Sequence, residues 1–120
     1  MNRDSPAEVF TQLYDLISGP AERERPWANV RALFYPNALL HSELTLPDGS
    51  HESGTWTVEQ FCEAAAAEYR RQGFWECEVA SRSDCFGHIA QVWSTYESRV
   101  GSPSTEPVGR GINAVHLLKR

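Results

Sequence analysis

The stretch that decides the fold is residues 74–100, FWECEVASRSDCFGHIAQVWSTYESRV. Its apolar residues recur at every second position, beginning with Trp75, Cys77 and Val79. This period is typical of a β-strand, whereas a helix repeats every three to four residues. The same period returns in the second half of the stretch, after the turn signal SDCFG at residues 83–87. We therefore predict two long antiparallel strands joined by a turn.

Segments with helical spacing precede these strands. Residues 5–20, SPAEVFTQLYDLISGP, begin with a capping signal, carry an apolar stripe and end in Gly-Pro. Residues 26–34, PWANVRALF, open on a proline that suits a first helical turn. Residues 55–73, TWTVEQFCEAAAAEYRRQG, contain a capping box formed by Thr57 and Gln60. We predict a helix in each segment.

The other regular segments are extended. Residues 38–56, ALLHSELTLPDGSHESGTW, hold a Pro-Asp-Gly turn signal between two extended pieces and predict a hairpin. Residues 110–120, RGINAVHLLKR, predict a final strand. Helices that precede and interrupt a run of strands, without β-α-β alternation, indicate an α+β domain. We expect a curved antiparallel sheet covered on one side by three helices.

The composition of the chain is typical of one globular domain. The chain has 120 residues, 41% hydrophobic content and a net charge of -5, so residues 1–120 can bury a core, and no basic run points to nucleic acid or an anionic membrane. No apolar stretch could span a bilayer and the N-terminus lacks the pattern of a secretion signal, so we predict a cytoplasmic protein. The cysteines Cys62, Cys77 and Cys85 lack metal or redox spacing and are expected to be reduced, mostly buried thiols.

Four short motifs, taken in order, are similar to those of a known superfamily. They are FYPNALL (34–40), TWTVEQF (55–61), GHIAQVWSTYESR (87–99) and RGINAVHLL (110–118). They resemble the nuclear transport factor 2-like superfamily, in particular its SnoaL-like and ketosteroid-isomerase-like bacterial members. The resemblance implies a cone-shaped domain whose sheet wraps an apolar pocket closed by helices, and a homodimer formed through the outer sheet face. It also implies a further strand after Leu118, which the sequence lacks.

One polar residue, Asn113, interrupts the apolar pattern of the final strand. If Asn113 and Val115 face the pocket, an amide enters an apolar cavity, where an unpartnered polar group costs about 1–3 kcal/mol. Such an amide can donate to a ligand oxygen, as in an oxyanion hole, or bond a neighbour and fix the sheet. The resemblance implies the first role, because ketosteroid-isomerase-like relatives hold an acid at this position that donates to an enolate. We assign Val92 and Tyr96 to the same pocket face.

The resemblance also implies candidate catalytic groups. In ketosteroid-isomerase-like relatives a carboxylate base ends the first strand, but the matching position here is Ser42, so His41 or Glu43 would have to act as the base. Imidazole suits proton transfer near neutral pH, although a strand histidine is otherwise a polar surface residue. Tyr14 resembles the hydroxyl donor on the first helix of these relatives, and the alternative is a core residue.

Two functions from different classes follow. One is a dimeric domain that binds a small apolar organic ligand. The other is an isomerase, cyclase or dehydratase in which His41 or Glu43 moves a proton next to a carbonyl polarised by Asn113. No metal, phosphate-loop or nucleophile motif is present, so we predict neither metal nor cofactor. Trp93, opposite in direction to Tyr96, is expected in the dimer interface or beneath a loop.

Overall fold

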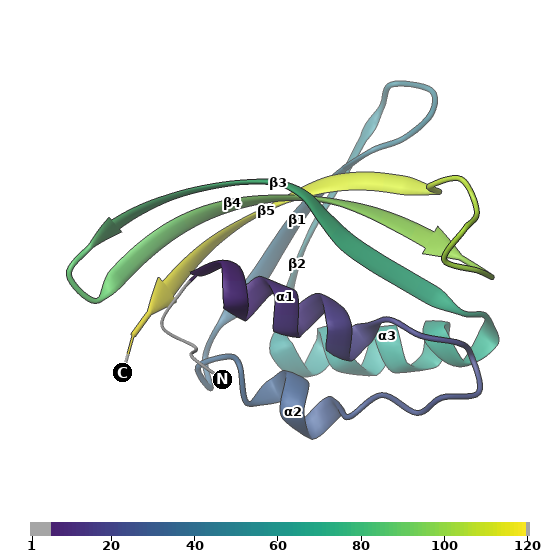
Figure 1. The fold of residues 1–120 in the computed structure, drawn as a ribbon, viewed down its shortest axis with the longest axis horizontal. Coiled ribbons are helices and arrows are strands. Elements are labelled where there is room, and N and C mark those ends of the chain that lie inside the picture. The colour runs from purple at the N-terminus through teal and green to yellow at the C-terminus, as the bar shows by residue number, and fades with distance from the viewer. Residues whose placement is uncertain (1–5, 120) are drawn as a thin grey trace.

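The computed structural model describes residues 6–119, and their helices and strands follow the predicted order. The helices are α1 (Pro6–Ile17), α2 (Trp27–Arg31) and α3 (Val58–Arg71). The strands are β1 (Leu39–Thr45), β2 (His51–Thr57), β3 (Phe74–Phe86), β4 (Ile89–Val100) and β5 (Gly109–Leu118). The described part of the chain is thus an α+β fold with one five-stranded antiparallel sheet and three helices, as predicted (Figure 1).

The helices lie on one side of the sheet, so the fold has two main layers (Figure 1). The strand order is β2-β1-β5-β4-β3, and all neighbours pair antiparallel. The strands β3, β4 and β5 form a long arch, and the β1–β2 hairpin crosses this arch at an angle. No helix within residues 6–119 is long and apolar enough to cross a membrane.

Local sequence signals account for the helix boundaries. The predicted capping box is present at the start of α3, where Gln60 N donates to Thr57 Oγ1 at 3.1 Å and Thr57 N donates to Gln60 Oε1 at 2.9 Å. Helix α2 ends at Arg31, earlier than the predicted boundary at residue 34. Each helix turns an apolar stripe toward the sheet, which builds one shared core. This core consists of Phe10, Tyr14, Ile17, Val30, Val58, Cys62, Ala65, Tyr69, Ala90 and Val92.

The last strand lies inside the sheet. β5 pairs with β4 along its whole length and with β1 over Gly111–Asn113. The edge strands are β2 and β3. The side of β5 that faces away from β4 is therefore occupied by β1 at these residues. The further strand after Leu118 stays a prediction.

A β-bulge decides which side chains of β3 face the helices. The register between β3 and β4 shifts by one residue just after Glu78. As a result Glu78 pairs with Tyr96, and Glu76 pairs with Ser98. Paired residues share a sheet face, so both glutamates point to the inner, helix-covered side. Without the extra residue, Val79 would pair with Tyr96 and both glutamates would point outward.

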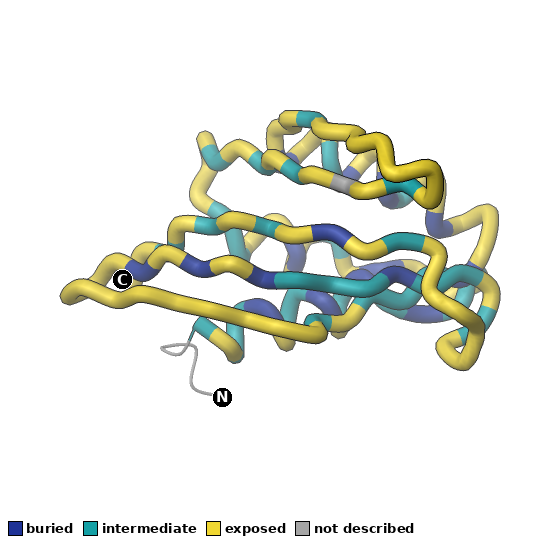
Figure 2. The backbone as a smooth tube through the Cα atoms, turned by 90° about the horizontal axis from the view of Figure 1, so that it is seen from above, coloured by how far each residue is buried: buried dark blue, intermediate teal, exposed yellow. Residues whose placement is uncertain are grey.

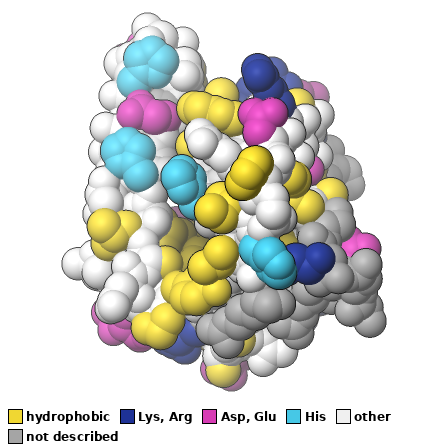
Figure 3. Space-filling model, turned by 90° about the vertical axis from the view of Figure 1, so that its left-hand side faces the viewer, with side chains coloured by type: hydrophobic (Ala, Val, Ile, Leu, Met, Phe, Trp, Pro, Cys, Tyr) yellow, Lys and Arg dark blue, Asp and Glu magenta, His cyan; other side chains and the backbone are white. Residues whose placement is uncertain are grey.

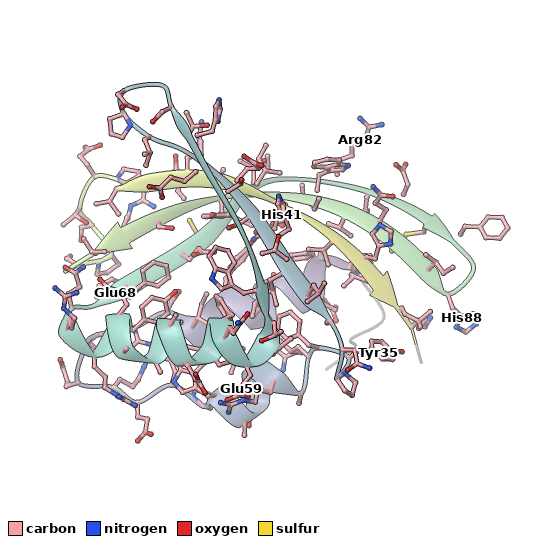
Figure 4. The ribbon with its side chains drawn as sticks, turned by 180° about the vertical axis from the view of Figure 1, so that it is seen from behind. Tyr35, His41, Glu59, Glu68, Arg82 and His88 are labelled. Atoms are coloured by element: carbon pink, nitrogen blue, oxygen red, sulfur yellow. The ribbon has the colours of Figure 1, made fainter. Side chains whose placement is uncertain are left out.

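The structure departs from the sequence pattern in two places. Arg82, which alternation groups with the glutamates, lies on the outer face and points away from the helices (Figure 4). Cys77 and Cys85 are exposed and only Cys62 is buried, so the prediction of mostly buried thiols was wrong. The segment of β3 from Val79 to Phe86 is exposed throughout (Figure 2).

Candidate functional site

A chain of hydrogen-bonded side chains crosses the inner face of the sheet. Asn113 Nδ2 donates to Tyr14 Oη at 3.3 Å, and Tyr14 Oη lies 2.8 Å from Ser94 Oγ. Ser94 Oγ in turn donates to Glu78 Oε2 at 2.5 Å. These side chains come from β5, α1, β4 and β3 in that order. The polar chain, as we call Asn113, Tyr14, Ser94 and Glu78, therefore ties three strands to the helix that covers them.

The direction of the hydrogen bonds in the polar chain follows from Glu78. A carboxylate only accepts hydrogen bonds, so the single hydroxyl proton of Ser94 goes to Glu78. Ser94 must then accept the proton of Tyr14, and Tyr14 accepts from the amide of Asn113. With Glu78 ionised, every donor in the polar chain points from Asn113 toward Glu78.

Asn113 lies where β1 and β5 stop pairing. It pairs with Ser94 of β4 and with Ser42 of β1, and it is the last residue of β5 that pairs with β1. Beyond it, β5 continues beside β4 only. Asn113 and Val115 are half-buried. The hydrogen bonds among residues 6–119 leave Oδ1 of Asn113 without a partner.

One end of the inner face is not covered by the helices. Ser81, Ser83 and Cys85 pair with inward-facing residues of β4, yet all three are exposed. They lie toward the turn between β3 and β4, which carries His88 (Figure 4). Figure 3 shows this end of the molecule, where apolar side chains gather in the middle with histidines around them. Within residues 6–119, the helices therefore leave this end of the inner face uncovered.

Tyrosines border the buried part of this face. Burial raises the pKa of Tyr14, against the hydrogen bonds to Ser94 and Asn113, which lower it. Burial and the charge of Glu76 raise the pKa of Tyr96 to about 12. A Cβ on Gly111 would lie 2.4 Å from Tyr96 Oη, so glycine makes room for this hydroxyl.

Glu76 is a second inward carboxyl group. Burial raises its pKa to about 7, although a hydrogen bond from Ser98 Oγ at 3.4 Å lowers it. A carboxyl group with this pKa is present in both protonation states near neutral pH, as a general acid or base must be. Sequence reasoning missed Glu76 and Glu78 because their direction depends on the bulge. A pair of acids in residues 74–80, which are otherwise apolar, was the only available signal.

His41 and Glu43 lie on the other side of the sheet. Ser42, between them, pairs with Asn113 and shares its face, so both neighbours point outward. Both are exposed, with His41 Nδ1 2.7 Å from Thr55 Oγ1 and His41 Nε2 3.5 Å from Glu43 Oε1 (Figure 4). The structure does not bring either group to Asn113. Proton transfer by His41 or Glu43 beside a carbonyl held by Asn113 is therefore not supported by this geometry.

The remaining residues expected at the site share the inner face. Tyr14 contacts Asn113 directly through the polar chain. Val92 is fully buried and pairs with the half-buried Val115, and the half-buried Tyr96 lies four residues further along β4 on the same face. These residues share the inner face, to which the structure adds Ser94, Glu76 and Glu78.

Two surface depressions lie elsewhere. A groove of about 670 Å³ runs between α2 and α3 and is lined by residues that include Trp27, Arg31 and Cys62. A smaller one of about 230 Å³ lies beside it, near Tyr69. No residue of the polar chain lines either depression. Their walls mix acidic and basic side chains and bring no set of reactive groups together.

Comparison with known proteins adds no family to this description. No protein-family model, curated protein or solved structure matches the chain. Within the described residues, no group of three or more His, Cys, Asp or Glu side chains could hold a metal ion. The fold and the site define an α+β protein whose inner face carries the polar chain, with all its donors pointing toward Glu78, and the carboxyl group of Glu76.

Proposed function

We propose that the inner face of the sheet binds a small organic molecule and that the chain is a SnoaL-like member of the nuclear transport factor 2-like superfamily. The order of the elements and the helix-covered antiparallel sheet support this family. The observation that carries the binding function is the half-buried amide of Asn113, whose Oδ1 has no partner among the described residues. This oxygen is not among the fully buried side-chain atoms that lack a partner, so a ligand can reach it. The apolar residues Val115 and Leu117 continue the same face toward the open end.

Asn113→Leu is expected to weaken binding of a small aromatic probe, para-cresol, about tenfold, because one hydrogen bond contributes about 1–1.5 kcal/mol. Ligand-observed NMR titration measures the affinity. The matched control is His116→Leu, which makes the same kind of change on the exposed, outer face of β5. Circular dichroism checks that both variants fold. Absence of binding to the wild type, or equal affinity for all three proteins, would contradict the proposal.

A second candidate function is proton transfer by Glu76, as in an isomerase, cyclase or dehydratase. The observation that favours it is the pKa of about 7 of this buried carboxyl group. In this reading Glu76 has the role that the sequence suggested for His41 or Glu43. No bound metal or cofactor is needed for a proton transfer of this kind.

We also propose a homodimer formed through the outer face of the sheet. Trp93 and Ile112 are 47% and 45% exposed on β4 and β5. Ile112 pairs with Thr95, two residues from Trp93, so the two apolar side chains are diagonal neighbours. Exposed aromatic and aliphatic groups on one face are typical of protein interfaces.

Trp93→Lys is expected to convert the dimer to a monomer, because it places a charge in the centre of the apolar contact. Size-exclusion chromatography with light scattering measures the mass. Val108→Lys is the control, since Val108 is an exposed apolar residue outside the strands of the outer face. A wild type that is monomeric at every concentration would refute the interface.

We place the protein in a reducing compartment, the cytoplasm. The chain has three free cysteines, of which Cys77 and Cys85 are exposed. Exposed thiols persist where glutathione and thioredoxin keep them reduced.

A further inference from the structure

We propose that the inner face selects ligands that present an N–H or O–H donor to Asn113 and disfavours ligands that present a carbonyl or carboxylate oxygen. This inference deepens the proposed binding function and rests on it. The hydrogen bonds and charges of the inner face support it.

The donors around Tyr14 and Glu76 on the inner face are committed to one another. The protons of Tyr14 and Ser94 are used inside the polar chain, and the hydroxyl of Ser98 donates to Glu76. One Nδ2 proton of Asn113 goes to Tyr14. A ligand oxygen could accept from the other Nδ2 proton of Asn113 or from the hydroxyl of Tyr96. It could not accept from Tyr14 while Glu78 is ionised.

Several acceptors on the inner face receive no hydrogen bond within residues 6–119. Among the described residues, Asn113 Oδ1 receives no hydrogen bond. Glu76 and Glu78 together have four carboxylate oxygens, and the side-chain hydrogen bonds reach only one oxygen of each residue. Each free oxygen can accept a donor from a ligand.

The charge of the inner face is negative. The inward positions of β3, β4 and β5 follow from their registers, and none of them is Lys, Arg or His. They do include Glu76 and Glu78. A face with carboxylates and no cation repels an incoming carboxylate and the negative end of a carbonyl dipole. Charge and hydrogen bonding therefore select for the same ligands.

The orientation of the Asn113 amide is fixed by the same network. If the amide were turned around, its oxygen would face Tyr14 Oη, whose only proton already goes to Ser94. Two acceptors would then meet without a proton between them, which is unfavourable. Glu78 is thus a positioning residue: through Ser94 and Tyr14 it keeps the Asn113 nitrogen on the inside and leaves the oxygen for a ligand.

The experiment compares probes of similar shape that differ in one group. They are para-cresol, which has a donor, para-methylanisole and para-methylacetophenone, which only accept, and para-toluate, which is an anion. Affinities are measured by ligand-observed NMR on the full chain at about pH 8, where Glu76, with its pKa of about 7, is mostly ionised. We expect para-cresol to bind about tenfold more tightly than either neutral acceptor, since one hydrogen bond is gained. We expect para-toluate to bind most weakly.

The variant Glu78→Gln tests the positioning role. An amide can donate to Ser94, so the polar chain can reverse and Tyr14 can donate to a ligand. The preference for para-cresol over para-methylacetophenone is expected to fall from about tenfold to about equal affinity. Glu106→Gln, in the exposed loop before β5, is the control and should keep the wild-type preference. If Glu78→Gln does not fold, the preference of the wild type among the four probes tests the inference by itself.

The outcomes separate this inference from the proposed function. Preference for the donor probe in the wild type, lost in Glu78→Gln, supports both. Equal or tighter binding of the carbonyl or carboxylate probe overturns the inference and leaves the binding function in place. An unchanged preference in a folded Glu78→Gln overturns the role of Glu78. If no probe binds the wild type, the proposed function fails and the inference with it.

Discussion

Arg25→Ala is expected to lower the free energy of unfolding by about 3–5 kcal/mol, because it removes the donor for a set of buried carbonyl groups. The side chain of Arg25 is only 5% exposed. Its guanidinium donates to the backbone oxygens of Ile17 at 3.0 Å, Gly19 at 2.6 Å, Pro20 at 2.9 Å and Arg23 at 2.9 Å. These include carbonyls at the C-terminal end of α1 and just beyond it, where a helix leaves carbonyls without intrahelical partners and favours a positive charge.

The position of Arg25 in the fold enlarges this effect. Gly19 and Phe74 exchange backbone hydrogen bonds of 2.7 and 3.0 Å, which tie the end of α1 to the start of β3. The guanidinium also lies 5.3 Å from the ring centre of Tyr69, within range of a cation–π contact. Loss of Arg25 therefore loosens a helix, a strand and the α3 contact together. Arg25→Lys should recover only part of the stability, because an ammonium group cannot reproduce the planar fork.

Urea unfolding followed by tryptophan fluorescence measures the change. The control is Arg31→Ala, which removes an exposed ion pair with Glu59 (Figure 4). Exposed pairs contribute little, so Arg31→Ala should stay near the wild type. Equal unfolding midpoints for the Arg25 and Arg31 variants would show that the buried guanidinium is dispensable.

The sequence could not have predicted this role for Arg25. The charged stretch of residues 21–25, AERER, indicates a polar link between two helices. No local sequence signal distinguishes Arg23 from Arg25. Burial of Arg25 depends on carbonyls of a helix end and of a strand that begins 49 residues later. Periodicity, in contrast, predicted what depends on local pattern. It predicted the helices and the shared face of Val92 and Tyr96, and a short local motif predicted the capping box of α3. The structure shows all three.

The candidate site was predictable only in part for the same reason. Asn113 stands out as a polar residue in an apolar strand, but its contact with Tyr14 spans 99 residues. The directions of Glu76 and Glu78 depend on one extra residue at Val79, and alternation alone turns them to solvent. Bulges often occur next to functional sites, where they re-aim a side chain. In this protein the bulge places two acids under the helices.

Glu76→Gln is expected to stabilise the protein at about pH 8 and to change its stability little at about pH 4. Burial raises the folded-state pKa of Glu76 from the ordinary 4.5 to about 7. Between these values the folded protein keeps a proton that the unfolded chain has released, so the free energy of unfolding falls as the pH rises through this window. Below it both states are protonated and Glu76 makes no difference. Above it the folded protein holds a buried negative charge.

The size of the effect follows from the two pKa values. The interval from 4.5 to about 7, at 1.36 kcal/mol for each pH unit, corresponds to about 3 kcal/mol. Glutamine resembles the protonated acid at every pH and can still accept from Ser98, so the variant should recover about this amount above pH 7. Urea unfolding at both pH values measures it. Glu52→Gln, an exposed hairpin residue, should show no such pH-dependent gain. A Glu76→Gln effect of the same size at both pH values would mean that the Glu76 carboxyl group titrates as it does in water.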